Sequence, residues 1–100
     1  MKEEIFNQYV DRVINLFGIT KEDFFLKSRK RDCVDARYLV YYLCSERRIQ
    51  ISYIQKFMNK NGHESSHTLI IHGIKTTKEK VEEDKDYQSI FKEIDKAVFI

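Results

Sequence analysis

Proline is absent from this sequence, and glycine occurs at only three of its 100 positions. A β-sandwich needs a turn signal about every ten residues, so the shortage of turn-forming residues excludes that class of fold. The sequence has no apolar run of about 18 residues and no signal-peptide h-region, so we expect a soluble, cytoplasmic protein with no membrane partner. With 42% hydrophobic residues the chain is too apolar to be disordered. We therefore predict one domain with a modest core over residues 1–100.

Cysteine occurs only twice, at Cys33 and Cys44, eleven residues apart within one predicted helix. That spacing corresponds to about 16 Å along a helix, which is too long for a disulfide. The histidines at positions 63, 67 and 72 follow, but no pair of these cysteines and histidines has a spacing typical of zinc sites. We predict two reduced structural thiols, no bound metal and no cofactor.

Apolar residues recur at intervals of three and four, a pattern that predicts amphipathic helices. The first helix is expected over Glu3–Phe17, the third over Cys33–Arg47 and the fourth from Ile49 to about Asn59. The remaining ones are a short second helix and a fifth with Ile70, Ile74 and Val81 on one face, of which Ile70 and Ile74 are expected to be buried. The apolar residues of the sixth helix are Tyr87, Ile90, Phe91, Ile94 and Val98. These elements predict an all-α domain of six helices around one core.

Several residues mark the expected helix ends. Gly18 suits the position after the first helix, where a left-handed residue is common. Thr20 and Asp23 have the spacing of a capping box for the second helix, and Asp32 is predicted to cap the third. The buried face of the third helix is predicted to comprise Ala36, Leu39, Val40 and Leu43.

The net charge of +2 conceals a segregation of charge along the chain. From Lys27 to Lys78 there are eleven lysines and arginines against four acidic residues, a net of +7, whereas the remainder has seven against twelve, a net of −5. Four of the basic residues fall within the five positions 27–31. Such a segment suits a polyanion such as nucleic acid, unless folding mixes these charges over the surface.

The strongest turn signal lies between the fourth and fifth predicted helices, at Asn59–Glu64. The fifth helix then begins after Ser65 or Ser66, with His67 and Thr68 in its first turn. Two helices joined by a glycine-containing turn, the second starting with short polar side chains, fit a helix-turn-helix, whose second helix presents its first turn to base edges.

Residues 66–72, Ser-His-Thr-Leu-Ile-Ile-His, resemble the Asp-His-Thr-Thr-Val-Leu-His signature of the bacterial replication initiator DnaA. Ser28–Arg37 resembles the basic loop of that family, which runs into a helix carrying an arginine. Ile51–Ile54 takes the place of the first helix of the motif, and Val13–Phe25 matches the opening of the domain. The resemblance covers about residues 10–96 and implies the fold of the C-terminal DNA-binding domain of DnaA, domain IV, which is Trp-repressor-like.

The resemblance also implies a division of labour on double-stranded DNA. The residues expected to contact bases in the major groove are Ser65, Ser66, His67 and Thr68. The residues expected to bind phosphates or to enter an adjacent minor groove are Arg29, Lys30, Arg31 and Arg37, with Lys56 and Lys60 as further phosphate contacts.

The sequence departs from the family at several positions. Ser66 stands where the family has an aspartate, Gln55 where it has a glycine, and Leu69 where it has a second threonine, so the DNA site read by the family need not be the site read here. Leu69 suits contact with a thymine methyl group instead. No Gly-x-x-x-x-Gly-Lys-Ser/Thr motif is present, so the resemblance implies a DNA reader without the ATPase. We expect a stand-alone regulator or accessory factor of replication or transcription, with a protein of one of those processes as a further partner. The sequence leaves open whether the bacterium or a mobile element encodes it.

Two other classes of function remain as alternatives. An enzyme is disfavoured, because the sequence has no glycine-rich loop, metal spacing or nucleophile motif, and we predict a protein without catalytic activity. The stronger alternative is a protein-interaction module that keeps the fold without binding DNA. Its surface would be formed by tyrosines, which are enriched in interface cores, namely Tyr38, Tyr41, Tyr42 and Tyr53.

Overall fold

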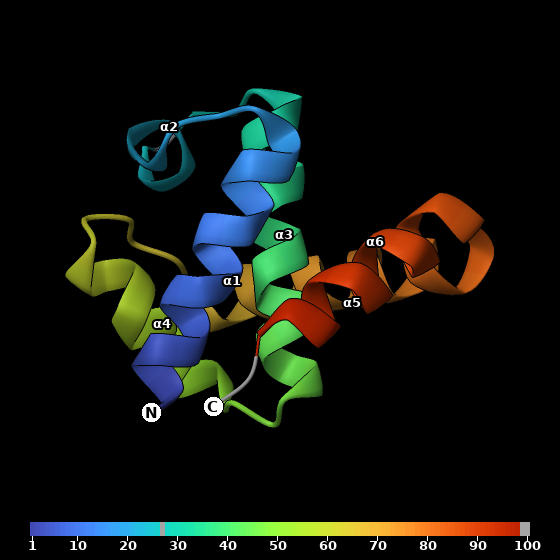
Figure 1. Ribbon diagram of the computed structural model, residues 1–100. Coiled ribbons are helices and arrows are strands. Elements are labelled where there is room, and N and C mark those ends of the chain that lie inside the picture. Colours follow the sequence, from blue (N-terminus) through green and yellow to red (C-terminus); the bar gives the residue numbers. More distant parts are fainter. Residues whose placement is uncertain (27, 99–100) are drawn as a thin grey trace.

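Six α-helices follow one another along residues 1–26 and 28–98, the part of the chain that this computed structural model describes (Figure 1). They are α1 (Lys2–Phe17), α2 (Lys21–Phe25), α3 (Arg31–Glu46), α4 (Ile51–Lys60), α5 (His67–Glu83) and α6 (Lys85–Ala97). The prediction of an all-helical chain with six helices around one core is confirmed. None of the helices among these residues combines the length and the apolar character needed to cross a bilayer.

The helix ends agree with the sequence at the first two helices and differ at the third. Gly18 ends α1 in the left-handed conformation, with φ at 67°. The Thr20 side chain accepts from the backbone of Asp23 in a complete capping box. The prediction that Asp32 caps α3 is wrong, because α3 begins at Arg31 and Asp32 already lies in its first turn. The Asp32 carboxylate there favours the helix electrostatically, next to the positive end of the helix dipole.

The third helix is the centre of the fold. It contacts α1, α2, α4 and α5, and the predicted core residues on it, Ala36, Leu39, Val40 and Leu43, are all fully buried. The fourth helix begins two residues later than predicted, and Ile49 is buried in the connection that precedes it. On α5, Ile70 is fully buried as predicted, whereas Ile74 and Val81 are only partly buried.

A glycine allows α5 to approach α3 closely. A Cβ atom built on Gly73 would lie 2.7 Å from Cδ1 of Tyr38 and 3.0 Å from Cδ2 of Tyr41. Real Cβ atoms do not approach ring carbons to 2.7 Å, so any side chain here would force the tyrosine rings to move. Gly73 therefore fixes the depth at which α5 packs on the central helix.

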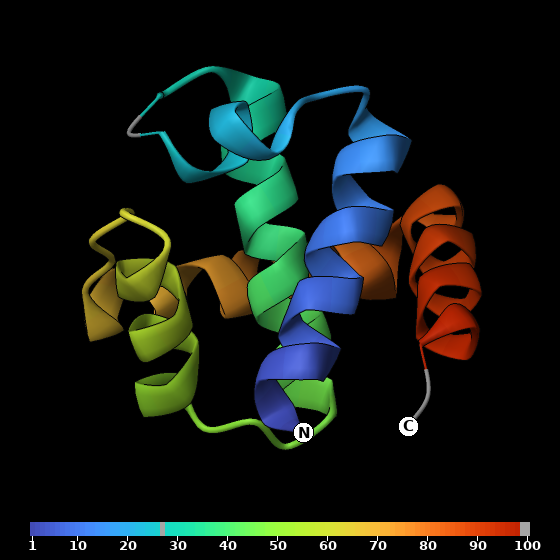
Figure 2. The ribbon, with the colours of Figure 1, turned by 60° about the vertical axis from the view of Figure 1, so that its left-hand side comes forward.

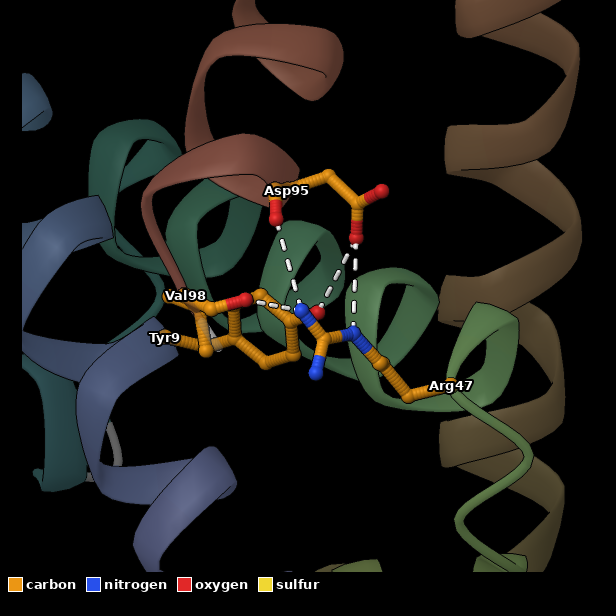
Figure 3. A network of polar contacts seen from close by, with 4 residues as sticks. All are labelled: Tyr9, Arg47, Asp95 and Val98. Atoms are coloured by element: carbon orange, nitrogen blue, oxygen red, sulfur yellow. Dashed lines mark hydrogen bonds and ion pairs between the residues drawn. The ribbon is translucent and has the colours of Figure 1, made fainter. Parts of the chain in front are cut away.

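Arg47 links the end of α3 to the end of α6 (Figure 3). Its guanidinium donates to the backbone carbonyl oxygens of Asp95 and Val98, and its Nε lies 3.7 Å from Oδ1 of Asp95. The hydroxyl of Tyr9 on α1 donates to the same Oδ1 at 3.2 Å. Burial raises the pKa of Tyr9 above its usual value, so the phenol stays protonated and can keep donating. The network thus joins the first, third and sixth helices.

Candidate nucleic-acid interface

The chain between α4 and α5 and the chain between α2 and α3 lie on one side of the molecule, away from α6 (Figure 2). The first connection covers residues 61–66, where Gly62 takes a positive φ of 88°. The fifth helix then begins at His67, with Ser66 as its N-cap: the Ser66 hydroxyl accepts from the backbone N–H of Leu69 at 3.1 Å. The start of α5 is therefore fixed by a turn that favours glycine and by a serine cap.

Ser65 does not lie on the surface, although the sequence predicts it as a base contact. Only 4% of Ser65 is exposed, and its hydroxyl lies 2.9 Å from the hydroxyl of Tyr41. Its carbonyl oxygen accepts from Nε2 of Gln55 at 2.8 Å, which ties α4 to the residue before the cap. Both polar groups of Ser65 are engaged inside the protein, so the structure removes it from the set of base contacts.

The other three predicted base contacts lie at the surface. Ser66, His67 and Thr68 are all exposed. Because the Ser66 hydroxyl caps the helix, His67 and Thr68 are the polar side chains of this turn that are available to an external partner. Both belong to the first turn of a 17-residue helix, where unpaired backbone N–H groups also point outward.

The same exposed face continues beyond the first turn, which sequence reasoning missed. Ile71, His72 and Lys75 are exposed, and they follow His67 and Thr68 at the intervals of four and seven that place residues on one face of a helix. The ring of His72 packs edge-on against Tyr38, with centroids 5.8 Å apart. The helical spacing of these residues could have identified them from the sequence, but the prediction considered only the first turn of the helix.

The basic loop leads into α3. Arg29, Lys30 and Arg31 are exposed, and Arg31 is the first residue of the helix. The Nε atom of Arg31 lies 3.8 Å from Oδ2 of Asp35, but 86% of the Arg31 side chain is exposed, so this pair restrains it little. Lys27, which the prediction counted with this loop, lies outside the described residues.

Arg37 is buried, contrary to the prediction that it reaches DNA. It is 5% exposed, and its Nη1 atom donates to the carbonyl oxygens of Phe24 and Leu26 at 2.9 and 2.8 Å. Its Nη2 atom donates to the carbonyl oxygen of Ser28 at 2.5 Å. Burial lowers the pKa of the Arg37 guanidinium, which nevertheless remains charged at neutral pH. The spacing of residues along a helix does not show which carbonyl oxygens a long side chain such as that of Arg37 will reach.

His63 joins the connection between α4 and α5 to the last residue of α2. Its side chain is 5% exposed, and its Nδ1 atom lies 3.0 Å from the carbonyl oxygen of Phe25. An open hollow of about 550 Å³ is lined by Ser28 and Arg29 of the chain before α3 and by Leu69 at the start of α5, among other residues. The basic loop and the start of α5 therefore border the same hollow, and the buried residues Arg37 and His63 also line it.

The two lysines predicted on α4 differ in their surroundings. Lys56 is exposed and makes no ion pair with the described residues. The Nζ atom of Lys60 lies 2.8 Å from Oε2 of Glu3 on α1, so a partner would have to compete with that carboxylate. Lys56 is therefore the better placed of the two for an external anion.

Charge also changes along α5. From His67 to Lys78 the helix has two lysines and no acidic residue, whereas its last five residues, 79–83, contain three acidic residues and one basic residue. The helix is about 25 Å long, so its acidic end lies far from its first turn. The segregation of charge predicted from the sequence therefore persists along this helix.

Comparison with known proteins gives no relative for this chain. No protein-family model, curated protein or solved structure matches it. The likeness to DnaA accordingly rests on the residues of the sequence.

The cysteines and tyrosines of the chain lie mainly in the interior. Cys33 and Cys44 are both buried and free, and burial raises the pKa of the Cys44 thiol above its usual value.

Among the four tyrosines considered as an interaction surface, Tyr41 and Tyr42 are buried, Tyr38 is partly buried and Tyr53 is 38% exposed. Among the described residues, no three His, Cys, Asp or Glu side chains are grouped closely enough to hold a metal ion.

Proposed function

We propose that this protein binds double-stranded DNA in a sequence-specific manner, with α4 and α5 as a helix-turn-helix and with the basic loop on the phosphates. In this proposal it acts as a regulator or accessory factor of replication or transcription. The observation that carries the proposal is the hollow that Arg29 of the basic loop and Leu69 in the first turn of α5 both line, because the exposed His67 and Thr68 belong to that same turn. The residue-by-residue likeness to the DnaA signature supports the same function.

The two parts of this surface suit the two parts of a DNA duplex. An α-helix with its side chains is about 10–12 Å wide and the major groove is about 12 Å wide, so the start of α5 fits the groove. Base edges are read by short polar side chains such as Thr68 and by the imidazole of His67. Phosphates need only positive charge, which Arg29, Lys30 and Arg31 supply.

Arg37 and Ser65 have supporting roles in this proposal. Arg37 holds three carbonyl oxygens on and after α2, so it orients the chain that carries the basic loop. Ser65 connects α3 and α4 to the residue that caps α5. Neither residue touches DNA, and the loss of either would affect binding through the position of a neighbour.

The test is the salt dependence of binding to a labelled duplex, measured by fluorescence anisotropy. Four phosphate contacts, from Arg29, Lys30, Arg31 and Lys56, would give a slope of log K against log salt of about −3.6. Lys30→Ala should reduce the magnitude of the slope by about 0.9, whereas Lys92→Ala on α6, a matched exposed lysine, should leave it unchanged. A flat response, or no binding at about 50 mM salt, would exclude DNA as the ligand.

A further inference from the structure

Two large apolar side chains are exposed near the start of α5. Ile71 is 51% exposed and Leu69 is 41% exposed. On a helix of 100° per residue they point about 160° apart, so one partner group cannot contact both from the same side. Leu69 lines the hollow beside the basic loop, whereas Ile71 lies on the outer face with His67 and Lys75.

Ile71 is surrounded by polar side chains of the outer face. His67 precedes it by four residues and Lys75 follows it by four, so the three form one line along the helix. Thr68 and His72 border that line on one side, and all four of these neighbours are exposed. A single branched aliphatic group amid hydrogen-bonding and cationic groups matches a base-pair edge that presents a methyl group beside hydrogen-bonding atoms and near phosphates.

We propose that Ile71 reads the 5-methyl group of a thymine in the major groove. The proposal rests on the proposed DNA-binding function and adds the class of base pair, A·T, that this position selects. Thymine alone among the four DNA bases carries a methyl group in that groove, and apolar side chains are the groups that contact it. Cationic Lys75, one turn further along the helix, gives the same face a charge complementary to the backbone.

The helix geometry sets where the thymine should lie. Ile71 is three residues beyond Thr68, which corresponds to about 4.5 Å along the axis of α5. Successive bases of one strand are about 3.4 Å apart, so the thymine should lie within one or two base pairs of the pair that Thr68 contacts. The sequence alone had pointed to Leu69 for such a contact, but Leu69 faces the hollow.

The experiment replaces thymine by deoxyuridine, which lacks only the methyl group. A preferred duplex is first selected from a random library with the full chain, and each thymine is then replaced singly and the Kd measured by anisotropy. Loss of one buried methyl-sized group corresponds to about a four-fold weaker Kd. We expect this loss at one position, or at two adjacent positions, near the base pair whose recognition depends on Thr68.

Variants assign the effect to a side chain. Ile71→Ala should bind the thymine duplex about four-fold more weakly and should no longer distinguish thymine from uracil at that position. Leu69→Ala, a matched exposed leucine of the same helix, and Leu16→Ala, a 49% exposed leucine on α1, should both keep the four-fold discrimination. Alanine is a strong helix former, and Ile71 lies outside the core, so the variant should remain folded.

The outcomes separate this inference from the proposed function. If no duplex binds, the DNA-binding function itself fails. If duplex DNA binds but every thymine can be replaced without loss, or if Leu69→Ala and not Ile71→Ala removes the discrimination, the inference about Ile71 is overturned while the function stands. A selected site without thymine within two base pairs of the Thr68 contact would overturn it as well.

Discussion

The hydroxyl groups of Tyr41 and Ser65 lie 2.9 Å apart, and both residues are buried. The bond joins the middle of the central helix to the residue that precedes the cap of α5. Because the Tyr41 ring also packs against Gly73 of α5, one side chain of α3 positions α5 both just before its first residue and further along its length. The position of the candidate recognition helix is therefore coupled to the stability of the core.

Removal of the Tyr41 hydroxyl should be costly. Tyr41→Phe leaves the buried Ser65 hydroxyl without a partner, which we expect to lower the free energy of unfolding by about 1–3 kcal/mol. Ser65→Ala should cost a similar amount, but the double variant should cost less than the sum, because neither polar group is then left alone. Urea denaturation of the wild type, the two single variants and the double variant gives a double-mutant cycle, with Tyr53→Phe as an exposed control. Strict additivity of the two losses would argue against a hydrogen bond between Tyr41 and Ser65.

Replacement of Arg37 should affect the fold and, through it, all DNA binding. Arg37→Met leaves three carbonyl oxygens without their donor, and we expect a loss of about 3 kcal/mol or more in the free energy of unfolding. Arg37→Lys should be intermediate, since one ammonium group cannot reproduce the guanidinium geometry. When the variants and the wild type are compared at equal concentrations of folded protein, the affinities for A·T-rich and G·C-rich duplexes should fall by the same factor. A selective loss on A·T-rich DNA would instead mean that Arg37 enters a minor groove.

Specificity and general affinity should depend on different residues. His67→Ala or Thr68→Ala should cost about 1–3 kcal/mol on the preferred duplex and leave binding to a random duplex nearly unchanged. Arg29→Ala should weaken both duplexes about equally and reduce the magnitude of the salt slope by about 0.9. Anisotropy on both duplexes distinguishes the two classes. Equal losses on both for His67→Ala and Thr68→Ala would show that the start of α5 does not read sequence.

Gly73→Ala should destabilise the protein although alanine favours helices. The gain in helix propensity is about 1 kcal/mol, but the added methyl group would lie 2.7 Å from a ring carbon of Tyr38. That atom belongs to the body of the ring and not to its flexible end, so the ring or the helix must shift. We expect the cost of overpacking to exceed the gain in helix propensity, so that the free energy of unfolding falls by up to about 2 kcal/mol. Thermal unfolding should show a lower Tm, and Gly73→Ala with Tyr38→Ala should recover stability relative to Tyr38→Ala alone.

Stability should fall in alkaline solution. Burial raises the pKa values of the Cys44 thiol and the Tyr9 phenol in the folded protein, whereas in the unfolded chain they are about 8.5 and 10. Above these values the unfolded chain releases protons that the folded protein retains, so the free energy of unfolding decreases as pH rises, by up to about 1.4 kcal/mol per pH unit and per group. Urea midpoints between pH 7 and 11 measure the decrease, and Cys44→Ala should delay its onset to about pH 10.

The sequence predicted local features of the fold more reliably than long-range contacts. The cap at Thr20, the left-handed Gly18 and the buried face of α3 all follow from spacing within a few residues, and all were confirmed. Arg37 and Ser65 were predicted as DNA contacts, and both are buried, because their polar atoms meet groups that lie 9 to 24 residues away along the chain. A charged or hydroxyl side chain is equally suited to a phosphate and to a buried carbonyl or hydroxyl group. Sequence spacing does not distinguish these environments, whereas tertiary packing does.

The contacts of Arg47 also bear on local unfolding at the C-terminal end of α6. The final carbonyl groups of any helix have no partner within the helix, and for that reason helix ends usually fray. In α6 the guanidinium of Arg47, at the end of α3, donates to two carbonyls of this last stretch, and Tyr9 of α1 bonds the adjacent carboxylate. We therefore expect amide protons in the final turn of α6 to exchange with solvent mainly when the link to Arg47 is broken. We expect the end of the sixth helix and the end of the third to unfold locally as one cooperative unit, although Arg47 and Val98 are 51 positions apart in the sequence.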